Sequence, residues 1–167
     1  MMARPSPDAT PWLWLSAVLV LADQASKYWA MHALEYGRPV PVIEGFWNWT
    51  LVHNTGAAFS FLSSAGGWQR WFFSLLAVLV SGLMVRWLRH TPRTDWRTAV
   101  PLALVVAGAV GNLIDRLRFG YVVDFVDWYY GTWHWPAFNL ADSAIVAGAI
   151  GLVLFSFAAP KRAGEGG

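Results

Sequence analysis

Four long apolar stretches alternate along the chain with more polar segments. Each is about 20 residues long, the length that an α-helix needs to cross a bilayer, and they cover residues 12–31, 68–88, 98–117 and 140–159. The first stretch has no small-residue cleavage site after it and carries Asp23 and Lys27, so we expect it to be retained rather than removed as a signal peptide. The pattern predicts an all-α membrane protein with four transmembrane helices in a single domain over residues 1–167.

The longer connecting segments, 33–67 and 118–139, have a different pattern. They contain short runs of alternating β-branched and aromatic residues, which are typical of strands, at 40–43, 46–53 and 121–126. We therefore expect a small β-sheet at one end of the helices. Glycines bracket residues 56–67, which we expect to be mobile, and a polar tail at about 161–167 is expected to be disordered.

The composition supports this class of protein. The chain is 56% hydrophobic and 13% charged, whereas an average soluble protein is about 25% charged. A net charge of +2 is too small for nucleic-acid binding, and the absence of Cys excludes thiol chemistry. Indole rings favour the membrane–water boundary, and nine of the twelve tryptophans lie near a predicted helix end: Trp12, Trp14, Trp29, Trp68, Trp71, Trp87, Trp96, Trp133 and Trp135.

The distribution of Lys and Arg predicts the orientation in the membrane. Positively charged residues stay on the cytoplasmic side, and seven of the twelve lie in the termini or in the segment between the second and third apolar stretches: Arg4, Arg86, Arg89, Arg93, Arg97, Lys161 and Arg162. Both termini are therefore predicted to be cytoplasmic. The segments 33–67 and 118–139 are then on the outer side.

Polar residues inside the apolar stretches are costly and mark candidate functional sites. Counting helix rise from the predicted cytoplasmic ends places them all at the outer membrane boundary: Asp23, Lys27, Asn112, Asp115, Arg116, Asn139 and Asp142, with Asp124 in the outer segment. This convergence predicts a site at the outer face.

Several of these residues also have structural interpretations. Asp23 and Lys27 are spaced for an ion pair on one helix face. Asp115 and Arg116 fit membrane-edge side chains that extend to water, although Arg116 is also placed to hold a carboxylate. The Asn139 and Asp142 spacing resembles a helix capping box. Small residues that let helices approach closely recur in the last two stretches: Gly108, Gly111, Ala144, Gly148 and Gly151.

Carboxylates are the candidate reactive groups at the outer membrane boundary. Two neighbouring carboxylates cannot both ionise cheaply, so one remains protonated and the pair can act as base and acid together. Such a pair can activate water for attack on an amide. A small transporter and a non-enzymatic membrane assembly factor remain as alternatives on these residues alone.

Five motifs in order resemble the lipoprotein signal peptidases, also called signal peptidase II. They are Asp23-Gln-Ala-Ser-Lys27, Asn54-Thr-Gly-Ala-Ala-Phe59, Gly111-Asn-Leu-Ile-Asp-Arg116, Val122-Val-Asp-Phe125 and Phe138-Asn-Leu-Ala-Asp-Ser143. The resemblance covers residues 12–158 and includes the number and order of the apolar stretches.

The resemblance implies an aspartic endopeptidase of the bacterial inner membrane, with its active site at the outer, periplasmic face. Its substrates are diacylglyceryl-modified prolipoproteins, cut just before the lipidated cysteine. The catalytic residues carried over are Asp124 and Asp142. Asn54, Gly56, Asn112, Arg116 and Asn139 are expected to line the site, while Asp23, Lys27 and Asp115 give structural support. No metal or cofactor is expected. The expected partners are prolipoprotein substrates and membrane lipids, and the protein is expected to be a monomer.

Overall fold

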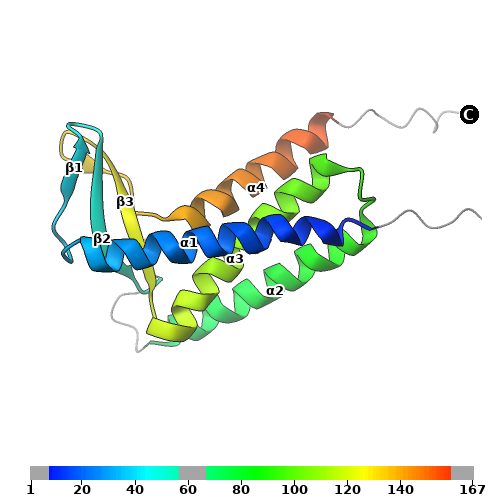
Figure 1. The fold of residues 1–167 in the computed structure, drawn as a ribbon, viewed down its shortest axis with the longest axis horizontal. Coiled ribbons are helices and arrows are strands. Elements are labelled where there is room, and N and C mark those ends of the chain that lie inside the picture. The colour runs from blue at the N-terminus through cyan, green and yellow to red at the C-terminus, as the bar shows by residue number, and fades with distance from the viewer. Residues whose placement is uncertain (1–7, 57–66, 159–167) are drawn as a thin grey trace, which may run out of the picture.

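The computed structural model describes residues 8–56 and 67–158 and contains four long helices and one sheet (Figure 1). The helices are α1 (Leu13–Ala33), α2 (Trp68–His90), α3 (Trp96–Phe119) and α4 (Leu140–Ala158). A short 3₁₀ turn, η1 (Thr10–Trp12), precedes α1. The predicted fold class is confirmed. The segment 56–67, which we expect to be mobile, lies outside the described residues except for its two end residues. The tail at about 161–167, which we expect to be disordered, also lies outside them.

The four helices run side by side along the long axis of the molecule, and the sheet lies across one end (Figure 1). The start of α1, the end of α4 and the α2–α3 connection all lie at the opposite end. Helix α3 packs against each of the other three helices and is mostly buried, so it forms the centre of the bundle.

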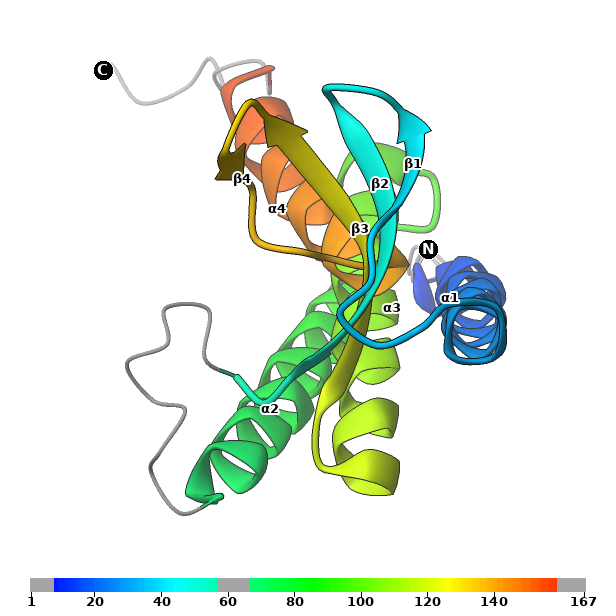
Figure 2. The same ribbon diagram turned by 90° about the vertical axis from the view of Figure 1, so that its left-hand side faces the viewer.

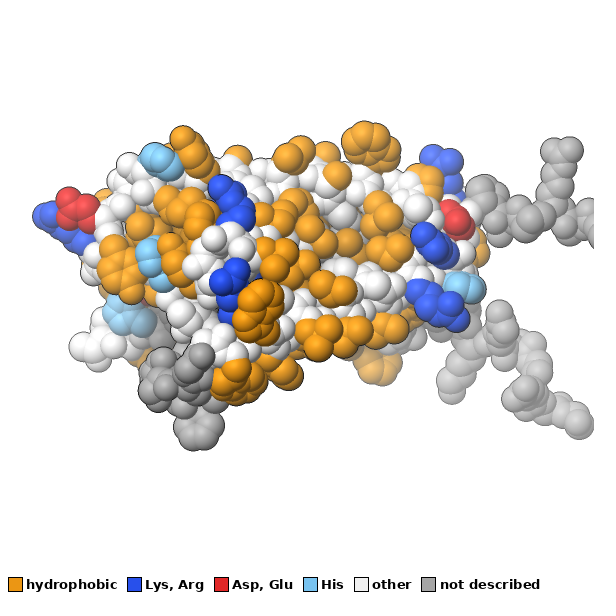
Figure 3. Space-filling view, turned by 90° about the horizontal axis from the view of Figure 1, so that it is seen from below, with side chains coloured by type: hydrophobic (Ala, Val, Ile, Leu, Met, Phe, Trp, Pro, Cys, Tyr) orange, Lys and Arg blue, Asp and Glu red, His pale blue; other side chains and the backbone are white. Residues whose placement is uncertain are grey.

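Helices α2, α3 and α4 are long and apolar enough to cross a membrane. Helix α1 is of similar length and is not among these three; its second half carries Asp23, Gln24 and Lys27. Asp23 and Lys27 are each only 1% exposed. They face the bundle, while Trp14, Val18 and Leu21 of α1 are exposed. Apolar side chains also lie along the length of the face that Figure 3 shows.

Close packing of α3 against α4 depends on glycine, as the sequence predicts. A Cβ atom at Gly148 would lie 2.7 Å from the backbone oxygen of Pro101 and 2.7 Å from a methyl group of Val105. Gly108 and Gly151 have equally close neighbours across the same interface. The two backbones can approach this closely because no side chain separates them.

The sheet contains four antiparallel strands in the order β1 (Val40–Ile43), β2 (Trp47–Asn54), β3 (Val122–Tyr130) and β4 (Trp133–His134). Figure 2 looks onto this sheet with the bundle behind it. The strands at 40–43 and 46–53 agree with prediction. Strand β3 extends four residues beyond the predicted 121–126, and β4 was not predicted.

A second contact of β3 positions the start of α4. Val126 pairs with Phe138, whose backbone oxygen accepts hydrogen bonds from the N–H groups of Phe125 and Val126 at 3.1 and 2.9 Å. Phe138 directly precedes Asn139 and α4. The first turn of α4 is thereby fixed beside the middle of β3.

The tryptophans divide into two groups. Trp47 and Trp49 on β2 form edge-to-face contacts, and Trp49 also packs against Trp29 of α1 and Phe125 of β3. This aromatic cluster joins the sheet to α1. Trp133 and Trp135 lie in and just after β4, a few residues before α4 begins at Leu140, and both are exposed.

The α3–α4 contact gives a first prediction. Gly148→Ala inserts a methyl group against Pro101 and Val105, and overpacking of this kind costs about 1–3 kcal/mol. We expect a lower midpoint of thermal denaturation for the purified protein in detergent. Gly82→Ala in α2 is the control, because a Cβ there has no neighbour within 4 Å. Equal midpoints for the two variants would contradict the interpretation.

Candidate active site

A chain of buried polar side chains runs through the junction of α1, α3, α4 and β3. At its centre is Lys27 of α1, whose ammonium group lies 2.8 Å from Oδ2 of Asp23, 2.9 Å from Oδ2 of Asp115 and 3.1 Å from Oδ1 of Asn112. An ammonium group has three N–H donors, and each finds an acceptor here. The predicted Asp23–Lys27 ion pair is confirmed.

The two carboxylates around Lys27 also bind backbone groups of other elements. Oδ1 of Asp23 accepts a 2.9 Å hydrogen bond from the N–H of Ala141 at the start of α4. Oδ2 of Asp115 accepts one of 3.1 Å from the N–H of Val123 in β3. Asp115 is only 1% exposed, so its interpretation as a membrane-edge residue extending to water is wrong.

Gln24 is a member of this cluster that sequence reasoning did not single out. Its side-chain nitrogen donates to Oδ1 of Asp115 at 2.9 Å, and to Asp23 and the backbone oxygen of Gly111 at 3.2 Å each. A neutral amide next to a charged residue gives no signal of its own in a single sequence. Its presence in the Asp23–Lys27 motif was the one available indication.

Asn112 and Asn139 connect this ion cluster to two further carboxylates. Oδ1 of Asn112 accepts from Lys27, while its nitrogen donates to Oδ1 of Asp142 at 2.7 Å. The nitrogen of Asn139, which is fully buried, donates to Oδ1 of Asp124 at 2.7 Å and to Asn112 at 3.3 Å. The two amides thus have fixed orientations, since each donates to a carboxylate on one side.

Asp124 lies in β3 and is 1% exposed. Besides Asn139, it accepts a 2.9 Å hydrogen bond from Asn54 of β2, and Asn54 in turn accepts from the N–H of Gly56. Burial, and secondarily the negative charge of Asp142, raises the pKa of Asp124 to about 7. The hydrogen bonds and the charge of Lys27 act in the opposite direction but do not cancel these effects.

Asp142 lies in the first turn of α4. Its Oδ2 accepts from the N–H of Asn139 at 3.3 Å, and Asn139 Oδ1 accepts from the N–H of Asp142 at 2.9 Å. These reciprocal bonds are those of a capping box, so this structural interpretation is confirmed. Because the side chain of Asn139 also binds Asp124, the residue that caps α4 also links the two aspartates.

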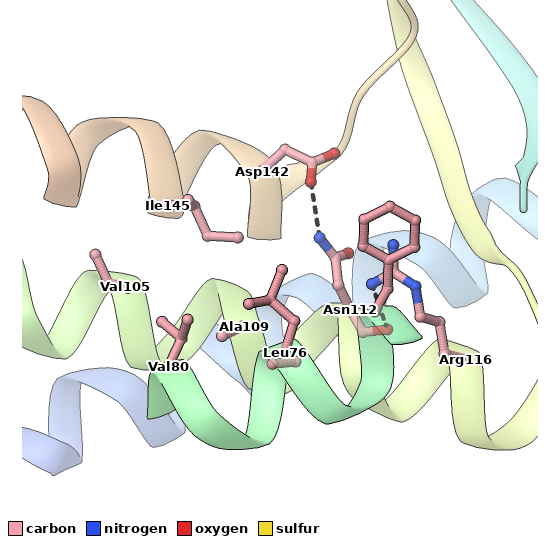
Figure 4. A pocket seen from close by; sticks show the side chains of 10 residues that line it. Leu76, Val80, Val105, Ala109, Asn112, Arg116, Asp142 and Ile145 are labelled. Atoms are coloured by element: carbon pink, nitrogen blue, oxygen red, sulfur yellow. Dashed lines mark hydrogen bonds between the residues drawn. The ribbon is translucent and has the colours of Figure 1, made fainter. Parts of the chain in front are cut away.

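Asp142 opens onto a pocket of about 310 Å³ between α2, α3 and α4. Figure 4 shows Asp142 and Asn112 pointing toward one another at one end of this pocket, with Arg116 nearby. The remainder of the lining is apolar and consists of Phe73, Leu76, Ala77, Val80, Val105, Ala109 and Ile145. A long apolar ligand segment can therefore lie against a polar, carboxylate-bearing end.

Arg116 and Gly56 approach the pocket from the outer edge of the bundle. The guanidinium of Arg116 lies 5.1 Å from the ring centre of Phe73 and donates to the backbone oxygen of Asn112 at 3.5 Å. It forms no salt bridge with a residue in 8–56 or 67–158, so the expectation that it holds a carboxylate stays a prediction. Gly56 has a φ of +100°, and a Cβ there would meet the Phe73 ring.

The arrangement brings together the residues that the sequence indicated. Asp124, Asp142, Asn54, Asn112 and Asn139 form one continuous hydrogen-bonded group, with Asp23, Lys27 and Asp115 adjoining it. Over the described parts of the chain, no group of three or more His, Asp or Glu side chains is arranged to hold a metal ion. The reactive groups of the site are two carboxylates and the amides that orient them.

Comparison with known proteins identifies the class. The family described as signal peptidase (SPase) II matches residues 15–158. The lipoprotein signal peptidase of Xanthomonas campestris pv. campestris (strain 8004) is 59% identical over 100% of both chains. That of Xanthomonas axonopodis pv. citri (strain 306) is 60% identical over 93% of this chain and 90% of its own. A solved bacterial membrane enzyme is 28% identical, with a TM-score of 0.76 over 99% of this chain and 100% of its own.

Fold, site and sequence similarity together define a membrane-embedded peptidase. The chain belongs to the signal peptidase II family.

The ion cluster gives a second prediction. Lys27→Met leaves Asp23 and Asp115 buried without their cation, and breaking a buried pair in this way costs about 3–5 kcal/mol. We expect a large fall in the free energy of unfolding, measured by denaturant titration in micelles. Adding Asp23→Asn and Asp115→Asn should restore part of it.

Arg38→Met is the matched control. Arg38 pairs with Glu35 at 2.9 Å, but both side chains are largely exposed, and exposed pairs contribute about 0–1 kcal/mol. If the Lys27 and Arg38 variants lose the same stability, Lys27 does not have the structural role inferred here.

The raised pKa of Asp124 gives a third prediction. A carboxyl group whose pKa rises on folding binds its proton more tightly when folded, so stability falls as the pH rises from about 4 toward about 7. The denaturation midpoint of the wild type should therefore be lower at pH 8 than at pH 5. Asp124→Asn removes this contribution and should narrow the difference. An unchanged pH dependence in the variant would argue against the raised pKa.

Proposed function

We propose that this chain is an aspartic endopeptidase that removes signal peptides from diacylglyceryl-modified bacterial prolipoproteins, cutting just before the lipidated cysteine. Asp124 and Asp142 are the catalytic residues in this proposal. Asn54, Gly56, Asn112, Arg116 and Asn139 line the active site, and Asp23, Lys27 and Asp115 support it. The Xanthomonas relatives are named lipoprotein signal peptidases, which supports the substrate class.

The observation that carries the proposal is that one buried residue, Asn139, binds both carboxylates, one through its side chain and the other through its backbone. Its side-chain nitrogen donates to Asp124 and its backbone N–H donates to Asp142. Two aspartates from different elements are thereby oriented toward a common region. A purely structural capping box requires Asp142 and Asn139, but it has no use for a second buried carboxylate.

The two carboxylates differ in environment, and this difference suggests their roles. Asp124 is buried in the sheet with a pKa of about 7, so a large share of the molecules carry its proton near neutral pH. Asp142 lies at a helix N-terminus, where the helix dipole favours a negative charge. Asp142 is therefore assigned as the base that takes a proton from water, and Asp124 as the acid that polarises the scissile carbonyl.

The reaction then follows from proton balance. Water loses a proton to Asp142 and its oxygen bonds to the scissile carbon, while Asp124 gives its proton to the carbonyl oxygen. When the carbon–nitrogen bond breaks, Asp142 passes its proton to the departing nitrogen of the cysteine. The hydroxyl proton of the collapsing intermediate returns to Asp124, which restores both groups to their starting states.

The pocket suits a substrate that is itself a membrane helix. Its polar end holds Asp142, Asn112 and Arg116, and its apolar walls come from α2, α3 and α4. A signal peptide can lie along these walls while its cleavage site reaches the carboxylates. In this proposal the sheet end faces the periplasm, both termini are cytoplasmic, and the protein acts as a monomer.

The direct test is cleavage of a lipid-modified precursor peptide by purified variants. Asp124→Asn and Asp142→Asn should each reduce kcat by about 10²–10⁴-fold, the usual contribution of a general acid or base. Asp127→Asn is the matched control. Asp127 is a buried aspartate of the same strand, but it binds Asn48 and His134 instead.

We expect the Asp127 variant to retain activity close to that of the wild type. Wild-type rates for either dyad variant, with the fold intact by circular dichroism, would refute the proposed mechanism.

A further inference from the structure

The end of the bundle opposite the sheet carries a concentration of basic side chains (Figure 3). The exposed residues here come from the end of α2, the α2–α3 connection and the start of α3: Arg86, Arg89, His90, Arg93 and Arg97. Two aspartates, Asp8 and Asp95, lie at the same end. Within residues 8–56 and 67–158, none of these arginines forms a salt bridge with an acidic side chain.

Two adjoining grooves at this end share Pro11 and Trp14. One is lined by Asp8, Trp14 and Arg89 together with apolar side chains of α1, and the other by Trp14, Leu15 and Arg93. Trp14 stands between them and is 76% exposed. We refer to the two together as the Trp14 groove.

The walls of the Trp14 groove are held in place by hydrogen bonds. The N–H of Ala9 donates to the backbone oxygens of Leu88 and Thr91 at 3.2 and 2.9 Å. The indole N–H of Trp12 donates to the backbone oxygen of Arg93 at 3.2 Å. The start of α1 is therefore fixed against the end of α2, and these hydrogen bonds hold the two walls of the groove in place.

The chemistry of the groove matches a headgroup that carries both signs of charge. Guanidinium groups bind phosphate through paired N–H donors; Arg89 supplies them in the groove that holds Asp8, and Arg93 lines the adjoining groove. A carboxylate and an exposed indole face both attract an ammonium group, and Asp8 and Trp14 supply these beside Arg89. The apolar side chains Leu13, Leu15 and Ala17 lie along α1, where an acyl chain would extend.

We propose that the Trp14 groove binds a phospholipid with a primary-amine headgroup, such as phosphatidylethanolamine. Arg89 binds its phosphate, Asp8 and Trp14 bind its ammonium group, and Arg93 adds positive charge from the adjoining groove. The carboxylate of Asp8 distinguishes this ligand from a purely anionic lipid, because it repels a headgroup without a positive charge. This lipid site is separate from the proposed catalytic residues, which lie at the other end of the bundle.

Native mass spectrometry of the full chain tests the proposal. The protein is released from micelles doped with equal amounts of phosphatidylethanolamine, phosphatidylcholine and phosphatidylglycerol with identical acyl chains. The amine lipid should be retained about tenfold over phosphatidylcholine, whose trimethylammonium group has no N–H donor. That ratio corresponds to about 1.4 kcal/mol, close to the lower end for a hydrogen bond to a charged group.

Two variants should change the binding in different ways. Asp8→Asn should abolish the preference for the amine lipid and increase retention of phosphatidylglycerol. Arg89→Gln should reduce retention of all three lipids about fivefold, since one basic side chain near a phosphate-rich surface contributes about 1 kcal/mol. Arg118→Gln is the control, because Arg118 is exposed at the sheet end of α3.

Three results would overturn the proposal. They are a wild-type preference for phosphatidylglycerol, an Asp8→Asn variant that keeps the amine-lipid preference, and equal loss of lipid from the Arg89 and Arg118 variants. Comparison of the three lipids on the wild-type protein decides the first point even if a variant fails to fold.

Discussion

The contact between Lys27 and its three acceptors is the interaction on which the rest of the structure depends. A charge in the interior of a helical bundle is stable only when it is paired and fully hydrogen-bonded. Meeting that requirement brings together α1, which carries Lys27 and Asp23, and α3, which carries Asp115 and Asn112. The same carboxylates bind the backbone of α4 and β3. One ammonium group therefore fixes the relative positions of four elements, and the two further aspartates are placed as a result.

The candidate site is built largely from amide side chains, and this choice has a physical reason. An asparagine between two carboxylates donates hydrogen bonds without adding a charge, so it orients both groups and leaves their electrostatic coupling in place. A lysine or arginine in the same position would hold both aspartates ionised. With Asn54, Asn112 and Asn139 as partners, one aspartate can stay protonated beside an ionised neighbour. The cation of the cluster acts from further away, behind Asn112.

The helices could be predicted from sequence because length and hydropathy are local properties, and the observed ends of α2 and α4 lie within two residues of those expected. The site residues could be predicted because polar groups in apolar helices are few and fall at one level. What the sequence could not show depends on tertiary contacts. Gln24 joins the ion cluster from a position without distinctive composition, Arg116 lies over Phe73, and Trp49 packs against Trp29 of α1. Strand β4 exists only because β3 continues far enough to pair with it.

The pairing of Val126 with Phe138 divides the segment 118–139 into two parts: the part that carries Asp124, and the loop between the two paired residues. It closes a loop that contains the end of β3, the turn at Gly131 and β4, so the distance between Asp124 and α4 is set at the base of this loop and not by its length. The turn at Gly131 lies beyond the strand pairs of Asp127 and Trp128 with β2, so a change of its length leaves the spacing of the two carboxylates unaltered. The turn at Gly131 is thus structurally independent of the frame that holds the two aspartates, and it is a suitable position at which to insert a label or an affinity tag.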